Sequence, residues 1–301
     1  MCIRDRASAP GCNANSVVDY VISALCRLDG VLELLLAEGT VGIVGMGNVG
    51  SCLYRRLSTL GIDCRAYDPL IDQSSYPILG DLDHVLDADV ICLHTPLTRL
   101  GSYPSFHLLD QDKLARIKPG VVIINAGRGA VIDNKALKQL LYQRDDICTV
   151  LDVWENEPDL DIELLKRVDL CSPHIAGYSY DGKLAGLEMM YQACCRFLSI
   201  QAEPEMGVGS DNELAIELGE QRNVIEAIRE AVLSCYDLAQ DDQRFRGSLL
   251  HSQQQQLAVE FDRLRKNYPV RRELSSYRIA NLNELDKAVI DSLAALGFIC
   301  R

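Results

Sequence analysis

The sequence lacks the features that mark membrane and secreted proteins. No apolar run reaches the roughly 18 residues that a transmembrane helix needs. Charged residues interrupt the most apolar stretch at positions 19, 27, 29 and 33. The first residues contain no apolar segment like that of a signal peptide. We therefore predict a cytoplasmic protein without a membrane contact.

Positive charge is also scarce. The chain has 30 Lys and Arg against 43 Asp and Glu, which gives a formal net charge of −13 at pH 7. Nucleic acids and anionic membrane surfaces would be repelled by this charge, so neither is expected as a partner. A local basic pocket for an anionic small molecule is compatible with it.

Paired cysteine motifs are absent. The twelve cysteines include no C-x-x-C pair, and they show no metal-like spacing with the five histidines. Cys92, Cys148 and Cys171 lie in apolar, strand-like runs, where a buried thiol behaves as a small hydrophobic group. We expect reduced cysteines in the core, no disulfide framework and no metal site.

What the sequence does contain is a regular alternation of strand and helix patterns. Continuous β-branched runs, such as Val121 to Ile124, suit strands that are buried on both faces. The expected strands are 40–44, 63–67, 90–94, 121–125, 148–152 and 170–172, and the expected helices between them are 51–60, 81–86, 110–116, 134–144 and 162–168. This alternation predicts an α/β fold with a doubly wound parallel sheet of the Rossmann type. Beyond residue 204, a helix at 222–239, a polar stretch and a strand–helix–strand pattern at 277–300 predict a small C-terminal α+β domain.

The stretch TVGIVGMGNVG, residues 40–50, is typical of a dinucleotide-binding turn. A strand pattern runs directly into it and a helical pattern follows. Gly45 would allow the tight turn, Gly47 the approach of a pyrophosphate and Gly50 the close packing of helix on strand. The phosphates would lie on free N–H groups at the helix N-terminus. Asp68 ends the next strand, where its carboxylate can bind the ribose hydroxyls and would repel a 2′-phosphate, so NAD is favoured over NADP.

Three groups of polar residues follow predicted strands, at the edge where ligands bind in such sheets. The first, NAGRG, presents Arg128, whose planar fork suits a carboxylate. The second, DVWENEP, carries Asp152 at the strand end and Glu157 before a proline. The third, SPHIAGY, contains His174. Taken singly, these residues could equally be a surface arginine, solvated carboxylates and a structural histidine.

Taken together, three of these side chains form a set suited to oxidising a secondary alcohol. His174 has the intrinsic pKa of a base that takes the hydroxyl proton as hydride leaves the carbon. Glu157 could hold the imidazole in one tautomer and stabilise the imidazolium. Arg128 could clamp a neighbouring carboxylate and the developing carbonyl.

Several motifs carry a resemblance to a known family. GIVGMGNVG, HTPLT, KPGVVIINAGRGAVID, LDVWENEP and SPHIAGY together resemble the D-2-hydroxyacid dehydrogenase family. Within it, APGCNA, PHIAGYSYDGK and FDRLRKNYPVRREL are similar to the branch that oxidises 4-phospho-D-erythronate to 3-hydroxy-2-oxo-4-phosphooxybutanoate, on the route to pyridoxal 5′-phosphate. The resemblance covers about residues 7 to 301.

The resemblance implies functional residues at the positions that match its motifs. Arg128, Glu157 and His174 would be catalytic, with His174 as the proton donor or acceptor, and Tyr178 would touch the substrate. It also implies a homodimer and a phosphorylated 2-hydroxy acid as substrate. Besides the three glycines of the turn, NAD would meet Asn48, Val49, Asp68, Thr95, Ala126, Gly127, Arg128, Asp152 and Gly177.

The same resemblance suggests a division of the chain. Residues 1–6 match nothing that follows and are expected to be a non-native leader, and residues 7–14 to be the remnant of a substrate domain that precedes APGCN in the family. The NAD-binding domain would span 15–180, a helix and linker 181–204, and the dimerisation domain 205–301. Without the substrate domain we expect weak or moderate NAD binding, poor turnover, and apolar surface exposed on helices 15–38 and 183–199.

Some alternatives stay open. A basic cluster, defined as Arg263, Arg265, Lys266, Arg271 and Arg272, is expected to be a solvated or interface face, and contact with a substrate phosphate is the alternative. The substrate could be another D-2-hydroxy acid, such as 3-phosphoglycerate. The chain could also be a non-catalytic, NAD-sensing interaction protein, since a fold does not fix a function.

Overall fold

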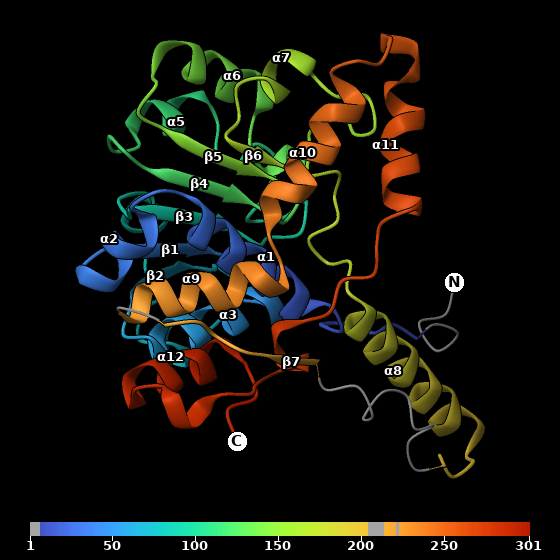
Figure 1. Ribbon diagram of the computed structural model, residues 1–301. Coiled ribbons are helices and arrows are strands. Elements are labelled where there is room, and N and C mark those ends of the chain that lie inside the picture. Colours follow the sequence, from blue (N-terminus) through green and yellow to red (C-terminus); the bar gives the residue numbers. More distant parts are fainter. Residues whose placement is uncertain (1–6, 204–213, 221–222) are drawn as a thin grey trace.

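Six parallel strands form the central sheet of the computed structural model, which describes residues 7–203, 214–220 and 223–301 (Figure 1). The predicted leader, residues 1–6, and the predicted boundary between the linker and the dimerisation domain at 204–205 lie outside these ranges. The strand order is β2-β1-β3-β4-β5-β6. The strands are β1 (Thr40–Val44), β2 (Asp63–Tyr67), β3 (Val90–Leu93), β4 (Val122–Asn125), β5 (Cys148–Leu151) and β6 (Leu170–Cys171). The predicted Rossmann-type sheet is confirmed.

The helices between the strands begin where short acidic side chains cap them. Asp81, Asp110, Asp133 and Asp161 each accept a hydrogen bond from a backbone N–H in the first turn of the helix that follows. These helices are α4 (Leu82–Leu86), α5 (Gln111–Arg116), α6 (Asn134–Gln143) and α7 (Ile162–Leu165). The first helix of the sheet, α3 (Asn48–Thr59), starts three residues earlier than predicted, because the end of the glycine turn already belongs to it.

The strands are buried on both faces, as their apolar runs predict. In β3, Val90 and Cys92 join one hydrophobic cluster, while Ile91 and Leu93 join the other. This alternation follows from the two-residue period of a strand. The apolar side chains of α1, α3, α9 and α12 fill the first cluster, and those of α5, α6, α7, α10 and α11 fill the second.

The N-terminal segment differs from the single helix expected at 15–38. It forms α1 (Ala14–Arg27) and α2 (Val31–Ala37). The extended backbone of Leu28 ends α1, and Gly30, with a left-handed backbone (φ 74°), precedes α2. Twelve of the 14 residues of α1 are buried. The expectation of an exposed apolar face was therefore wrong for α1, because α3, α9 and α10 pack around it.

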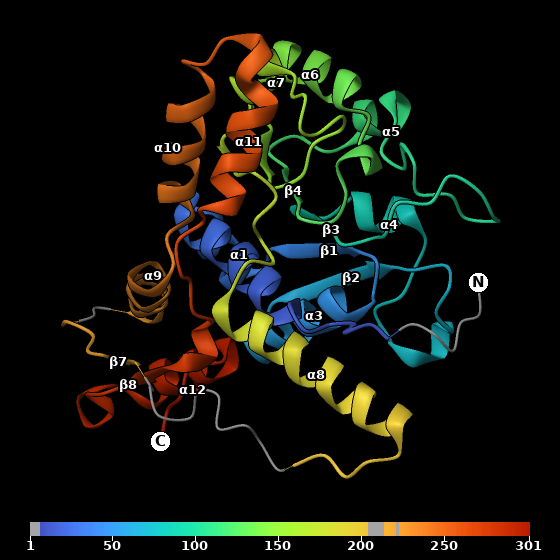
Figure 2. The ribbon, with the colours of Figure 1, turned by 90° about the vertical axis from the view of Figure 1, so that its right-hand side faces the viewer.

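The helix α8 (Tyr180–Leu198) does expose apolar surface, as predicted for 183–199. It projects away from the body of the molecule in both views (Figures 1 and 2). The side chains of Leu187 and Phe197 are 59% and 72% exposed. No helix within the described ranges is both long and apolar enough to cross a membrane.

The C-terminal unit contains more helix than predicted. Its elements are β7 (Leu214–Ile216), α9 (Val224–Cys235), α10 (Leu238–Leu249), α11 (Leu257–Lys266), β8 (Tyr277–Ile279) and α12 (Lys287–Leu296). The predicted polar stretch holds most of α10 and all of α11, which pack through Phe245 and Phe261. The expected last strand, 298–300, is reduced to a bridge between Ile299 and Arg278.

A buried ion pair fastens the C-terminal unit to the sheet domain. The Asp19 carboxylate in α1 lies 2.5 Å from the Arg56 guanidinium in α3. Its other oxygen accepts a hydrogen bond from the backbone N–H of Leu274, at 2.9 Å. Burial raises the pKa of Asp19, and Arg56 opposes this rise. Because the partners come from α1, α3 and the C-terminal unit, these three parts hold a fixed relative position.

Candidate active site

A cavity of about 400 Å³ opens where the strand order reverses, beyond the carboxyl ends of β1 and β3. Ligands bind at this switch point in doubly wound sheets. The loops after β1, β3, β4, β5 and β6 all contribute to its wall. The lining residues are Gly11, Asn13, Val17, Gly47, Asn48, Val49, His94, Thr95, Pro96, Ala126, Gly127, Arg128, Asp152, His174, Gly177 and Tyr178.

The glycine turn has the geometry that its sequence predicts. Gly45 adopts a left-handed backbone with φ of 95°. A Cβ atom on Gly50 would lie 1.9 Å from the Gly45 carbonyl oxygen, so only glycine allows the helix to pack this close. A Cβ atom on Gly47 would meet nothing within 4 Å. Open space therefore lies over Gly47, as the approach of a pyrophosphate requires.

Asp68 lies beside this turn. One of its carboxylate oxygens accepts a hydrogen bond from Met46 N–H at 2.9 Å, and the other accepts from Leu70 N–H at 3.0 Å. These two bonds fix the carboxylate against the glycine turn. Asp68 is not among the residues that line the 400 Å³ cavity, so any ribose contact would lie beyond its rim.

Glu157 and His174 form a bonded pair. The Glu157 Oε1 atom lies 2.6 Å from His174 Nδ1. His174 has a left-handed backbone (φ 58°), which is uncommon for a non-glycine residue. Because Nδ1 is held by the carboxylate, Nε2 is the ring nitrogen left to exchange a proton with a ligand.

Asp152 holds the loop that carries this histidine. Its carboxylate is buried and accepts hydrogen bonds from the Ser172 hydroxyl and from the backbone N–H groups of Ile175 and Ala176, at 2.7 to 3.0 Å. Burial raises the pKa of Asp152, while nearby His174 and these hydrogen bonds oppose the rise. Asp152 thus fixes the histidine loop (residues 172–178) by these hydrogen bonds, and it also lines the cavity.

Arg128 reaches the same cavity from the loop after β4. Asn125 shapes this loop by bonding to the backbone of Gly127 and of Arg128 itself. A Cβ atom on Gly129 would lie 1.9 Å from the Trp154 carbonyl carbon, so the loop packs directly on the Glu157 loop. The guanidinium donates to the Gly127 carbonyl at 2.7 Å. Within the described residues no carboxylate lies within 4 Å of it, so its charge is available to an anionic ligand.

Two further residues of the wall have unpartnered polar atoms. Both ring nitrogens of His94 and the Thr95 hydroxyl are buried without a hydrogen-bond partner. Burial lowers the pKa of His94 to about 4, so its imidazole is neutral at physiological pH. Buried polar groups are normally satisfied, and a ligand with amide and hydroxyl groups would satisfy these. The open space over Gly47 and these donors and acceptors fit a dinucleotide such as NAD.

The comparisons with known proteins agree with this geometry. Residues 27–176 match the family described as D-isomer specific 2-hydroxyacid dehydrogenase, NAD binding domain. Erythronate-4-phosphate dehydrogenase from Cellvibrio japonicus is 45% identical over 298 residues, which cover 98% of this chain and 78% of that protein. The chain belongs to the erythronate-4-phosphate dehydrogenases. The enzyme of that name from Pseudomonas entomophila is 43% identical over 97% of this chain and 76% of its own length. Residues 213–297 match a domain of unknown function, DUF3410.

Solved structures of other dehydrogenases share the fold of this chain. D-lactate dehydrogenase from Lactobacillus jensenii, solved with NAD+, has a TM-score of 0.52 and 23% identity, covering 64% of this chain and 67% of its own. The 3-phosphoglycerate dehydrogenase of Entamoeba histolytica, also solved with NAD+, has a TM-score of 0.53 and 23% identity, covering 63% of each chain. At this identity the likeness shows the fold alone. The membership of the chain in a family of NAD-dependent dehydrogenases is shown by its closer relatives and by its NAD-binding domain.

Five residues of the wall were missed by the sequence analysis. Gly11 and Asn13 belong to the segment that was interpreted as a remnant, and Val17 belongs to the helix expected at 15–38. Their place in the wall depends on a contact between distant parts of the chain, since a Cβ atom on Gly177 would lie 2.3 Å from the Asn13 amide nitrogen. His94 and Pro96 lie in the HTPLT motif, where only Thr95 was selected.

The basic cluster, which was expected to be a solvated or interface face, is partly internal. Arg271 is buried and donates to carbonyl oxygens of Ser16 and of Ala176, in the histidine loop. Arg272 pairs with Asp181 at 2.9 Å. These two arginines hold the C-terminal unit against α1, the histidine loop and the start of α8. Only Arg263 and Lys266 are exposed as expected.

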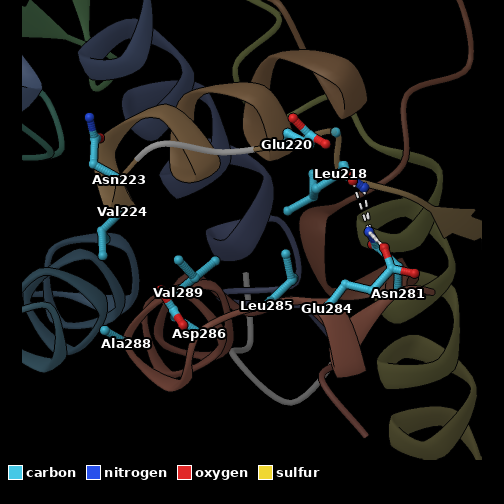
Figure 3. A pocket seen from close by; sticks show the side chains of 11 residues that line it. Leu218, Glu220, Asn223, Val224, Asn281, Glu284, Leu285, Asp286, Ala288 and Val289 are labelled. Carbon is cyan, nitrogen blue, oxygen red and sulfur yellow. Dashed lines mark hydrogen bonds between the residues drawn. The ribbon is translucent and has the colours of Figure 1, made fainter.

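Two other features do not compete as active sites. A cavity of about 760 Å³ lies in the C-terminal unit, beside a pair of hydrogen bonds between Leu218 and Asn281 (Figure 3). The described residues that line it include carboxylates and no basic side chain, which does not suit an anionic substrate.

His107, Asp133 and Glu155 cluster within 4.8 Å. The carboxylates of Asp133 and Glu155 accept hydrogen bonds from backbone N–H groups at the start of α6. They therefore stabilise the N-terminus of that helix.

Proposed function

We propose that this chain oxidises 4-phospho-D-erythronate to 3-hydroxy-2-oxo-4-phosphooxybutanoate with NAD. The observation that carries the proposal is the Glu157–His174 pair, bonded at 2.6 Å, in the same cavity as the Arg128 guanidinium. The identity of 45% to a protein named for this substrate supports the choice of hydroxy acid. In the cell, the reaction would contribute to pyridoxal 5′-phosphate synthesis in the cytoplasm.

The three side chains divide the work. NAD, when bound, accepts the hydride from the carbon that bears the hydroxyl group. His174 Nε2 takes the hydroxyl proton, so that proton and hydride leave together and a carbonyl forms. Glu157 accepts the Nδ1–H hydrogen bond and stabilises the imidazolium. Arg128 binds the substrate carboxylate and the carbonyl oxygen as it gains negative character.

The glycine turn, the neighbouring Asp68 and several residues of the cavity wall would hold the cofactor. Gly45, Gly47 and Gly50 with Asn48 and Val49 suit the pyrophosphate, and Asp68 suits the ribose hydroxyls. Thr95, Ala126, Gly127, Asp152 and Gly177 line the 400 Å³ cavity, where the nicotinamide would lie. Tyr178 would contact the substrate.

We also propose a domain division and an assembly. Residues 15–180 would form the NAD-binding domain, 181–204 a connecting helix and linker, and 205–301 a dimerisation domain. The separate family match at 213–297 supports a distinct C-terminal module. A homodimer would have twice the 33.4 kDa mass of one chain in light scattering, and a monomeric mass would refute it.

The substrate assignment predicts a clear preference. With NAD, kcat/KM for 4-phospho-D-erythronate should exceed that for 3-phosphoglycerate at least tenfold, and NAD should be preferred to NADP. NADH formation at 340 nm measures both. A higher value for 3-phosphoglycerate would favour the other dehydrogenase, and NAD binding without turnover of either acid would favour the NAD-sensing protein.

A further inference from the structure

Tyr178 in the cavity wall is in contact with a cation from the C-terminal unit. Its hydroxyl oxygen accepts a hydrogen bond from the Arg265 guanidinium in α11, at 3.0 Å. The guanidinium carbon also lies 5.7 Å from the centre of the Tyr178 ring. Arg265 comes from the segment that matches a domain of unknown function, so this segment reaches the wall of the cavity.

The Tyr178 hydroxyl group is the acceptor in this hydrogen bond. Arginine can only donate, so the phenol oxygen is the acceptor and its own O–H is left to donate elsewhere. A hydroxyl that accepts from a cation is polarised and becomes a better donor to an anion. Tyr178 lines the cavity. Its proton is therefore suited to an anionic group of the ligand.

A second cation adds to the positive charge around Tyr178. Lys183 Nζ, in the first turn of α8, lies 5.5 Å from the centre of the Tyr178 ring. Within the described ranges neither Lys183 nor Arg265 has a carboxylate within 4 Å, whereas the nearby Asp181 is neutralised by Arg272. The positive charges of Lys183 and Arg265 are therefore not neutralised by a carboxylate of the described residues.

We propose that the Tyr178 hydroxyl, held by Arg265 and assisted by Lys183, binds the phosphate group of the substrate. The cavity then has two positive regions, with Arg128 for the carboxylate and this site for the phosphate. That arrangement selects a doubly anionic hydroxy acid over lactate-like acids. Arg265 acts through Tyr178 and is a positioning residue. The inference rests on the proposed function, because it assigns one end of that substrate.

A pair of ligands that differ only in the phosphate tests the inference. 4-Phospho-D-erythronate and D-erythronate are titrated by calorimetry into the NADH-bound chain, in which no hydride can be transferred. Arg265→Met and Tyr178→Phe should each weaken the phosphorylated ligand at least about tenfold and D-erythronate less than twofold. The double variant should be little worse than either single one, because the two side chains act as a unit. Arg265→Lys should recover part of the loss.

The controls separate a specific effect from a structural one. Lys266→Met removes the same charge from an exposed position of α11 and should leave both affinities unchanged. Lys183→Met, at an exposed position that should not disturb folding, should cost about threefold for the phosphorylated ligand only. In turnover, Arg265→Met should raise KM and leave kcat within twofold.

Different results would contradict the phosphate site and the proposed function. Equal losses for both ligands in Arg265→Met, or no loss for either in Arg265→Met and Lys183→Met, would overturn the phosphate site while leaving the proposed function intact. A parent chain that binds and oxidises neither 4-phospho-D-erythronate nor D-erythronate would overturn the proposed function and this site with it.

Discussion

Replacing His174 by Asn is expected to slow NADH formation by about 10³-fold, within the range that general-base catalysis contributes. Asn has no group that can take the hydroxyl proton at neutral pH. It is also the non-glycine residue that best tolerates the left-handed backbone of this position (φ 58°), so the loop should keep its conformation. The rate is measured under single-turnover conditions with the chain in excess, where slow chemistry stays measurable.

The control for this prediction is cofactor binding. The affinity of the His174→Asn chain for NAD, measured by fluorescence titration, should stay within about twofold, because cofactor binding depends mainly on the glycine turn and its neighbours. Glu157→Gln should lose less activity than His174→Asn, since it removes the orienting charge and keeps the base. Turnover that survives in His174→Asn would show that another group is the base.

Substituting alanine at Gly50 is expected to lower the free energy of unfolding by about 3 kcal/mol and to abolish NAD binding. The new Cβ atom would lie 1.9 Å from the Gly45 carbonyl oxygen, which belongs to the backbone and cannot move without opening the glycine turn. Urea denaturation measures the stability and fluorescence titration the affinity.

Gly47→Ala provides the matched control for Gly50→Ala. The same methyl group at Gly47 meets nothing within 4 Å, and the backbone there (φ −69°) accepts alanine. Stability should stay within about 0.5 kcal/mol, as for other unhindered substitutions. NAD affinity should still fall about tenfold or more, because the methyl group lies where the pyrophosphate approaches. Unchanged affinity in Gly47→Ala would place the cofactor elsewhere.

Local signals were sufficient for the sheet domain. Patterns of only a few residues predict the strand at 40–44, the glycine turn after it, and the buried strands β3 and β4. Asp81 and Asp133 likewise mark the starts of α4 and α6 by capping. For these elements local preference and tertiary packing agree, so sequence patterns placed them within three residues of the observed ends.

Features that depend on distant partners were not predictable in the same way. The burial of α1 follows from its packing against α9 and α10, which lie some 200 residues away in the sequence. Arg271 looks like a surface residue in a basic run, but the Ser16 and Ala176 carbonyl groups that bury it come from separate loops. The contact of Arg265 with Tyr178 joins residues 87 positions apart, and no local pattern marks it.

The central claim is that Arg128, Glu157 and His174 meet beside a nicotinamide ring. A crystal structure of the chain with NAD tests it most directly. We predict the pyrophosphate over Gly47 and the nicotinamide ring in the 400 Å³ cavity, with C4 facing His174 Nε2 across the space for a substrate. A nicotinamide ring outside this cavity, or one separated from His174 by the protein backbone, would contradict the account.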